Sequence, residues 1–392
     1  MSLRLLHCIH SVDPTGGGPV EGLKQLSQIC RELGHVVEVL SLDDPTAPCV
    51  AACPVPVHAA GPGWRGYGYT PRFDAWLRAH RRDYDMVIVN GLWQYNAFGT
   101  WRALHGTDTP YVVYPHGMLD PWFKRTYPLK HLKKCLYWPW ADYRVLRDAA
   151  AVLFTCEEER LQARRSFRLY RCVERVVAYG TPGPPSGDPE LFRRAFAARW
   201  PETEGRRCLL HLGRMHEKKG PDLVLRAFAR QLQRRPAAEP WHLIMAGPAG
   251  HPYGVAMREL ARSLGLDARV TWTGMVEGAL KWGAFYQSEA FLLPSHQENF
   301  GIVVAESLAC GRPVLISDQV NIWREIEDAG AALVAPDDLP GTEQLLARWS
   351  ALTGTERSAM GARARACFTS RFGIAASAAS LIAAVTPFVR RP

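Results

Sequence analysis

Short apolar runs alternate with amphipathic stretches along most of the chain. Apolar runs that predict buried strands occur in the first half at residues 3–12, 35–42, 85–92, 110–117 and 149–156. Between the first two, residues 20–34 have apolar positions at helical spacing and end at Gly34, a residue that commonly closes a helix. A strand, a helix and a second strand in this order predict a βαβ unit, and therefore a parallel sheet.

The same alternation restarts after a break. Residues 181–189 read TPGPPSGDP, which indicates a linker, and residues 43–72 are rich in Pro, Gly and Ala and predict a loop. Beyond the break, strands are predicted at residues 207–215, 241–250, 269–276, 290–295 and 313–318, and helices at 221–234, 253–265 and 301–311.

We therefore expect an α/β protein with two doubly wound, Rossmann-like domains. The predicted boundaries are an N-terminal domain at 1–185, a C-terminal domain at 205–370 and a helical tail at 371–392 that packs back on the N-terminal domain. Ligands of open parallel sheets bind beyond the carboxyl ends of the strands, so two such domains facing each other would form a cleft.

Composition narrows the partners only slightly. Of the 392 residues, 47% are hydrophobic and 22% charged, as in ordinary globular enzymes, and the net charge is +9. A basic chain suits phosphorylated ligands, an anionic membrane or nucleic acid, but no nucleic-acid-binding module is visible. The start of the chain is too short and polar for a signal peptide, and no apolar run reaches the ~20 residues of a membrane span. We expect a cytoplasmic protein.

Two segments carry residues suited to a phosphorylated ligand. Residues 213–220 read GRMHEKKG and lie between a predicted strand and a helix, where Arg214 and Lys219 can bind phosphate oxygens beside a helix N-terminus. A solvated basic turn would look similar. Residues 294–314 read PSHQENFGIVVAESLACGRPV, with Glu298 and Glu306 on either side of a predicted helix start. Each carboxylate can accept hydrogen bonds from vicinal hydroxyls, although Glu306 could instead cap or solvate its helix.

Glu298 and Glu306 match the E-x7-E signature of retaining glycosyltransferases with the GT-B fold. The surrounding S-x-x-E-x-F-G-[IV]-V-x-x-E pattern, the GR-x4-KG element and the N-terminal glycine turn resemble glycosyltransferase family 4. The segments HGMLDPW and VNIWREI are similar to a bacterial subgroup of exopolysaccharide and O-antigen assembly. The resemblance implies retaining, metal-independent transfer of a hexosyl-type sugar from a UDP- or GDP-linked donor to a glycan or a polyprenyl-diphosphate-linked acceptor.

The resemblance also implies residue roles. The catalytic group would comprise His116, Arg214, Lys219 and Glu298, with Arg214 and Lys219 on the diphosphate and His116 and Glu298 on the donor sugar. The donor-binding group would comprise Gly17, Gly18, Gly213, Met275, Val276, Phe300, Gly301, Ile302 and Glu306, with Glu306 on the ribose and Met275 and Val276 beside the base. His116 could alternatively be a buried structural histidine.

Two features depart from this pattern or compete with it. Many family members carry a Gly-Gly pair after the strand that corresponds to 313–318, whereas residues 319–326 here read QVNIWREI. Asp83 and Asp85 match the D-x-D motif that binds a metal and a diphosphate in another glycosyltransferase fold, but they open a predicted strand. The resemblance implies neither a cofactor nor a metal.

Residues 122–147 form a basic stretch with interleaved aromatic residues. They contain seven Lys or Arg residues and one Asp, and these residue types are typical of segments that lie on an anionic membrane. We expect this stretch to dock on the inner face of the membrane, near a lipid-linked acceptor. The alternative is an ordinary basic helix whose aromatic residues belong to the core.

Two rival functions remain open from the sequence. One is another GT-B enzyme, such as an epimerase or a phosphorylase, although E-x7-E disfavours the first and no cofactor-lysine motif supports the second. The other is a non-catalytic GT-B subunit of a polysaccharide-assembly complex.

Overall fold

The computed structural model describes residues 2–234 and 241–389 of the chain. The chain divides into two units, each built on its own parallel sheet: unit 1 is Met1–Thr181 with Ile374–Pro392, and unit 2 is Pro182–Gly373. The predicted class, α/β with two Rossmann-like units, is confirmed.

Unit 1 contains a sheet with strand order β3-β2-β1-β4-β5-β6-β7, in which every pairing is parallel. Its strands are β1 Arg4–Ile9, β2 Val36–Ser41, β3 Val57–Ala59, β4 Met86–Asn90, β5 Tyr111–Tyr114, β6 Ala151–Phe154 and β7 Glu174–Val176. Its helices are α1 Gly18–Glu32, α2 Pro48–Ala51, α3 Pro71–His80, α4 Tyr95–Leu104, α5 Trp122–Thr126, α6 Pro128–Tyr137, α7 Asp142–Asp148, α8 Glu157–Ala163 and α17 Ile374–Val385.

The continuous apolar runs of unit 1 follow from burial on both faces of its sheet. In β1, Leu6 and Cys8 belong to one buried cluster, and Leu5 and Ile9 belong to another. Because successive side chains of a strand point to opposite faces, a strand covered on both sides has no polar face to keep.

Unit 2 repeats this architecture with strand order β10-β9-β8-β11-β12-β13, again with parallel pairings. Its strands are β8 Arg207–Leu212, β9 Trp241–Ala246, β10 Val270–Gly274, β11 Ser288–Leu293, β12 Val314–Ser317 and β13 Ala332–Ala335. Its helices are α9 Pro189–Arg199, α10 Pro221–Arg234, α11 Pro252–Ser263, α12 Gly278–Gln287, α13 Ile302–Ala309, α14 Trp323–Asp328, α15 Leu339–Ala351 and α16 Gly354–Cys367.

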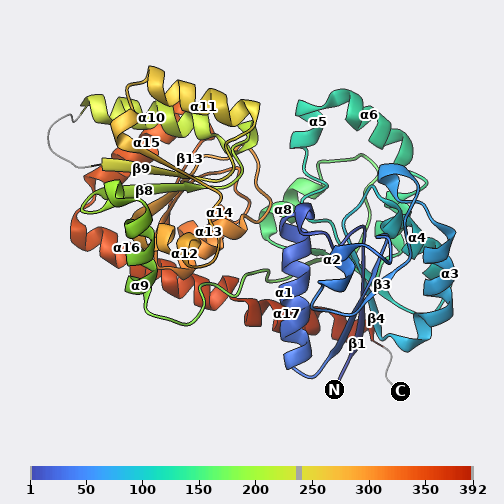
Figure 1. Cartoon of the computed structure of the whole chain (residues 1–392). Coiled ribbons are helices and arrows are strands. Elements are labelled where there is room, and N and C mark those ends of the chain that lie inside the picture. Colours follow the sequence, from blue (N-terminus) through green and yellow to red (C-terminus); the bar gives the residue numbers. More distant parts are fainter. Residues whose placement is uncertain (1, 235–240, 390–392) are drawn as a thin grey trace. The chain divides into compact units, whose positions relative to one another are not determined.

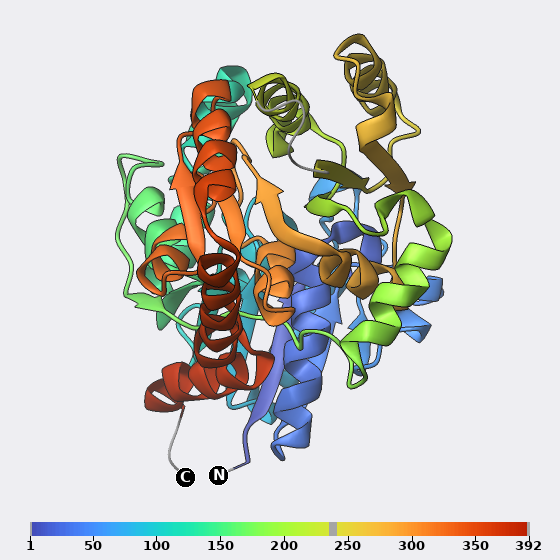
Figure 2. The same ribbon diagram turned by 90° about the vertical axis from the view of Figure 1, so that its left-hand side faces the viewer.

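The C-terminal helix α17 returns to unit 1 and packs beside α1, as Figures 1 and 2 show. Its buried side chains recur at helical spacing, at Ile374, Ala378, Leu381 and Val385, and they join the core formed with β1 and α1. The Ala-rich tail is thus an amphipathic helix whose apolar face completes unit 1.

One loop prediction was too simple. Residues 43–72 contain α2 and the edge strand β3, because Val57–Ala59 pairs with Val39–Ser41 of β2. After the Pro- and Gly-rich stretch, residues 189–199 form helix α9, which packs against α12 of unit 2. Gly283 of α12 permits this packing, since a Cβ there would lie 2.3 Å from the Phe192 carbonyl oxygen.

Candidate functional site

The turns that follow β8, β9 and β10 meet at the carboxyl edge of the unit 2 sheet. The Gly213 amide donates to Ala246 O at 2.9 Å, and the Gly247 amide donates to Gly274 O at 2.8 Å. A Cβ on Gly247 would lie 1.8 Å from Gly213 O, so this approach requires glycine. The backbone therefore forms an edge of the kind at which parallel α/β sheets bind ligands.

The predicted basic turn follows β8 directly. Arg214 is exposed, and residues Glu217–Lys219 form a short 3-10 turn that begins at His216, whose Nδ1 accepts from the Lys218 amide at 3.1 Å. Gly220 ends the turn with a φ of +64° and leads into α10. A Cβ on Gly220 would lie 2.5 Å from Pro294 O, so the turn lies directly against the segment after β11.

Hydrogen bonds join this turn to the second predicted segment. Lys218 O accepts from Ser295 Oγ and from the His296 amide, both at 2.8 Å. Beside these bonds, the Lys219 ammonium forms an ion pair with the Glu298 carboxylate, and both side chains are less than one-fifth exposed. The two segments that the sequence selected are therefore one cluster in space.

The electrostatics of Lys219 are unusual for a lysine. Burial, together with the positive charges of Lys218 and Arg214, lowers the pKa of Lys219 to about 7. The carboxylate of Glu298 acts in the opposite direction, because an adjacent negative charge favours the ammonium form. An anionic ligand beside Lys219 would likewise favour the ammonium form.

Residues 319–321 support Glu298 from the other side. The Glu298 amide donates to Gln319 O, and the Asn321 amide donates to Glu298 O, both at 2.9 Å. The segment at 319–326, where many family members carry Gly-Gly, is therefore hydrogen-bonded to the loop that contains Glu298. One parallel β-bridge links Glu298 and Val320. Buried Val320 and Ile322 anchor this segment in the core.

Helix α13 starts immediately after this loop. Gly301 is its N-cap residue with a φ of +74°, and a glycine has no side chain with which to cap the helix. The first amides of a helix lack intrahelical acceptors, so those around Ile302 can donate to an anion. Phe300 is buried, and a Cβ on Gly301 would lie 3.1 Å from Glu298 Cγ, so the helix start and the carboxylate adjoin.

Glu306 lies on α13, about one helical turn after its first residue, Ile302. It is 5% exposed, and its Oε1 accepts from Lys281 Nζ of α12 at 2.5 Å. No local sequence pattern indicated Lys281, because the pair joins different helices. Of the two residues predicted beside the base, Met275 is 64% exposed after β10 and Val276 is buried.

The predicted residues of unit 1 lie at the carboxyl edge of its own sheet. Gly17 precedes α1 with a φ of +76° and an open Cβ position, Gly18 is the first residue of that helix, and no described side chain caps it. His116 follows β5 with a φ of +50°, a conformation that non-glycine residues rarely adopt. Its ring stacks on Tyr114 at 5.3 Å between centroids.

The turn at His116 is fixed by buried polar partners that the sequence analysis missed. His116 Nε2 lies 3.2 Å from Asn90 Oδ1, and the Gly117 amide donates to Glu159 Oε1 at 2.6 Å. The other oxygen of Glu159 accepts from the amide and hydroxyl of Thr155. A polar residue ending strand β4 was the signal that could have selected Asn90, since parallel α/β sheets bind ligands at the carboxyl ends of their strands.

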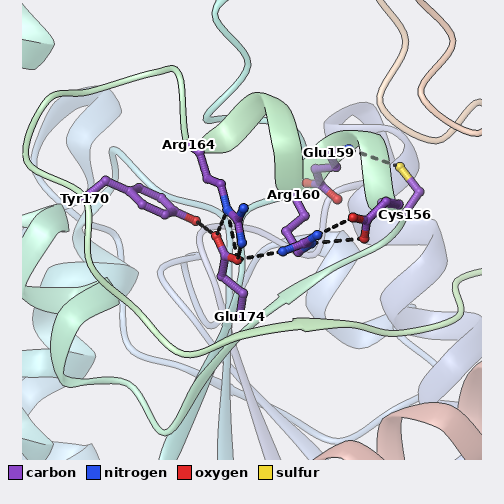
Figure 3. A network of polar contacts seen from close by, with 7 residues as sticks. Cys156, Glu159, Arg160, Arg164, Tyr170 and Glu174 are labelled. Atoms are coloured by element: carbon purple, nitrogen blue, oxygen red, sulfur yellow. Dashed lines mark hydrogen bonds and ion pairs between the residues drawn. The ribbon is translucent and has the colours of Figure 1, made fainter.

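Figure 3 shows the network of polar contacts around helix α8, the helix that carries Glu159. Arg160 of α8 and Arg164, the residue that caps its C-terminus, both donate to Glu174 of β7, and the Tyr170 hydroxyl donates to Glu174 at 2.9 Å. Burial raises the pKa of Glu174, but the hydrogen bonds from Arg164, Tyr170 and Arg160 outweigh it and hold that pKa below its ordinary value. These charged bonds attach α8 to the sheet edge, with Glu159 on the same helix.

The D-x-D residues lie away from these edges. Asp85 precedes β4, at the amino end of the strand, and its carboxylate accepts from the Arg4 amide at 2.7 Å. Within the described residues, no group of three His, Cys, Asp or Glu side chains is arranged to hold a metal ion.

Two family models cover most of the chain. The model of "Glycosyl transferase 4-like domain" matches residues 17–180, and the model of "Glycosyl transferases group 1" matches residues 192–366. The chain belongs to the GT-B glycosyltransferases, of the family 4 type. The first match lies in unit 1 and the second in unit 2.

Curated relatives match part of the chain. A D-inositol 3-phosphate glycosyltransferase of Nocardiopsis dassonvillei is 34% identical over 50% of this chain and 47% of its own length. An alpha-D-kanosaminyltransferase of Streptomyces kanamyceticus is 29% identical over 50% of each chain. The chain thus spans about half the length of the curated relatives that it matches.

Solved glycosyltransferase structures share the fold over nearly the whole chain. Sucrose-phosphate synthase from Thermosynechococcus elongatus has a TM-score of 0.76 at 19% identity, covering 98% of this chain and 99% of that one. Anabaena HepE in complex with UDP and glucose also has a TM-score of 0.76, at 16% identity, covering 98% of this chain and 100% of that one.

Proposed function

We propose that this GT-B protein transfers a hexosyl-type sugar from a UDP- or GDP-linked donor to a glycan or lipid-linked oligosaccharide in bacterial surface polysaccharide synthesis. The observation that carries the proposal is the ion pair of Lys219 and Glu298 beside the start of α13, whose N-cap residue is a glycine. A diphosphate needs positive charge and amide donors, and a sugar needs carboxylate acceptors; this cluster supplies both.

The residues of unit 2 divide the donor between them. Lys219, Arg214 and the amides at the start of α13 bind the diphosphate and stabilise the charge that grows on it as the sugar leaves. Glu298 accepts from sugar hydroxyls, Glu306 from ribose hydroxyls, and Met275 and Val276 border the base. The solved HepE complex with UDP and glucose supports this choice of donor class.

Transfer proceeds with retention at the anomeric carbon. The bond from that carbon to the phosphate oxygen breaks as the acceptor oxygen attacks on the same face. The acceptor proton passes to the departing phosphate oxygen, so the reaction needs no protein nucleophile. The positive charges of Arg214 and Lys219 serve the leaving group, and the proposed reaction uses no divalent ion.

The experiment is a panel of nucleotide sugars screened by thermal shift, followed by a transfer assay with EDTA present. A bound donor stabilises only the folded protein, so the correct donor raises Tm, and at a fixed concentration the shift grows with the logarithm of its affinity. Product NMR then reports the anomeric configuration. Donor binding without hydrolysis or transfer to any glycan acceptor would instead identify a non-catalytic binding subunit. An inverted product would contradict retention.

We further propose that the protein contacts an anionic membrane through helix α6. Leu129, Leu132, Leu136 and Trp140 are 82%, 61%, 71% and 49% exposed, and the first three recur at helical spacing. Lys130 and Lys133 are exposed beside them, and residues 121–141 contain no Asp or Glu. An apolar stripe flanked by lysines fits the interface of an anionic bilayer, where each Lys contributes about 1 kcal/mol.

Other residues of the 122–147 stretch belong to the core. Trp138 is 2% exposed, and the Lys134 ammonium lies 4.3 Å from the centroid of the Trp93 ring. The membrane contact therefore depends on the leucines and on Lys130 and Lys133 rather than on the whole stretch. In the described residues, no helix has both the length and the hydrophobicity that a membrane-spanning segment requires.

Flotation with phosphatidylglycerol vesicles tests this contact. We expect Leu132→Ser with Leu136→Ser, and separately Lys130→Glu with Lys133→Glu, to lose most of the floated protein. The control is Leu191→Ser, which removes a leucine that is 63% exposed in unit 2. Equal flotation of all variants, or light scattering that shows the leucines join two copies of the chain, would overturn the proposal.

A further inference from the structure

The ring of His116 is held by a buried amide. Asn90 is the last residue of β4, is 6% exposed and pairs in register with Tyr114 of β5, two residues before His116. Asn90 Oδ1 lies 3.2 Å from His116 Nε2. The parallel pairing of the two strands therefore places this amide against the ring.

The orientation of the Asn90 amide follows from its other contacts. Its Nδ2 lies 3.1 Å from Ile88 O and 3.2 Å from His7 Nδ1. An amide nitrogen only donates and a carbonyl oxygen only accepts, so Nδ2 must face Ile88 O. A flipped amide would place two carbonyl oxygens against each other. Oδ1 therefore faces His116, and the proton of the His116 ring must be on Nε2.

Both histidines of this group are neutral at physiological pH. Burial lowers the pKa of His116 to about 4, and burial together with the nearby His116 lowers that of His7 to about 4. A neutral ring that carries its proton on Nε2 has a lone pair on Nδ1. Among the described residues, His116 Nδ1 has no hydrogen-bond partner.

We propose that Asn90 is a positioning residue that sets the tautomer of His116, so that Nδ1 accepts a hydrogen bond from a sugar hydroxyl. The role in sugar binding rests on the proposed glycosyltransferase function, whereas the tautomer rests on the contacts of Asn90 alone. His7 and the Ile88 carbonyl hold the amide, the amide holds the ring, and the ring presents an acceptor to a hydroxyl. A ring with its proton on Nδ1 would donate to the hydroxyl oxygen instead and would leave the hydroxyl's hydrogen without this acceptor.

The tautomer can be measured directly in the ligand-free protein. In protein labelled with 15N histidine, NMR of wild type should show His116 neutral and protonated on Nε2 down to about pH 5, since its pKa lies near 4. In Asn90→Leu, the two tautomers should become mixed and kcat/KM for transfer should fall about 10-fold or more. Tm and circular dichroism report whether this variant folds.

The matched control is Asn96→Leu. Asn96 is also a buried asparagine, and its Nδ2 donates to Asn90 O at 3.0 Å without a recorded contact to His116. It should lose stability but keep the wild-type tautomer. A wild-type ring protonated on Nδ1, or an Asn90→Leu variant with unchanged tautomer and kcat/KM, would overturn the inference. Wild type with the expected tautomer but no transfer from any donor would overturn the proposed function and leave the Asn90–His116 relationship standing.

Discussion

Lys219 and Glu298 form an ion pair that joins the turn after β8 to the loop after β11. The contact is enclosed, since the two side chains are 17% and 18% exposed. An anion that binds the Lys219 ammonium must therefore share this ammonium with the Glu298 carboxylate or displace the carboxylate from it. This competition ties diphosphate binding to the position of the carboxylate that we assign to the donor sugar.

Lys219→Ala should weaken nucleotide-sugar binding by about 10- to 100-fold, because it removes one charged hydrogen bond worth about 1.5–3 kcal/mol. Titration calorimetry with the donor selected by thermal shift measures the effect, and a transfer assay measures kcat. The control is Arg226→Ala, which removes an exposed cation from α10, the helix that follows the turn of Lys219. If the two variants bind donor equally well, Lys219 does not hold the diphosphate.

Donor binding should weaken as pH rises. Burial lowers the pKa of Lys219, so the ammonium loses its proton at a lower pH than an exposed lysine does. The diphosphate prefers the charged form, and affinity should therefore fall by up to about tenfold per pH unit above the lowered pKa. A sugar nucleotide is a suitable probe, because its phosphate diesters do not titrate between about pH 7 and about pH 9.

Lys219→Arg separates this cause from others. A guanidinium remains charged throughout this range, so its affinity should stay level while that of wild type falls. A slope that persists in Lys219→Arg would assign the pH dependence to another group.

Sequence reasoning predicted what local pattern and motif spacing encode. The apolar periods predicted the parallel α/β units. The position of a basic turn after a strand selected Lys219, the spacing of two carboxylates around a helix start selected Glu298, and the family resemblance supplied His116. Sequence reasoning missed the partners that arrive from distant segments: Lys281 for Glu306 and Asn90 for His116. These contacts depend on how strands and helices pack, which no local window of sequence contains.

The edge strand β3 illustrates a second limit. Residues 43–72 have the composition of a loop, yet Val57–Ala59 adopts strand geometry because β2 offers an unpaired edge beside it. Tertiary pairing overrides weak local propensity in so short a segment.

Gly220→Ala should separate the two segments of the unit 2 site. The alanine would have to adopt a left-handed backbone conformation, and its Cβ would lie 2.5 Å from Pro294 O. We expect a loss of roughly 1–2 kcal/mol from the backbone conformation and about 1–3 kcal/mol more from the clash. Gly205→Ala is a matched control, because its φ is +69° but no atom lies within 4 Å of the new Cβ. Denaturant unfolding of both variants measures the difference, and equal losses would show that the Pro294 contact does not constrain the turn.

Lys281→Met should destabilise unit 2 through Glu306. Glu306 is 5% exposed and Lys281 Nζ is a charged donor to its Oε1, so removal of the ammonium leaves a buried carboxylate without that bond. The expected loss is about 1–3 kcal/mol. Adding Glu306→Gln to Lys281→Met should recover part of it, because a neutral amide needs no counter-charge, and a double-mutant cycle from urea unfolding measures the coupling.

The ribose role of Glu306 is tested in the same variants: Glu306→Gln alone should weaken nucleotide binding, whereas Lys281→Met should not weaken it once the protein is folded. Additive losses of unfolding free energy in the cycle would mean that the contact between Lys281 and Glu306 does not stabilise unit 2.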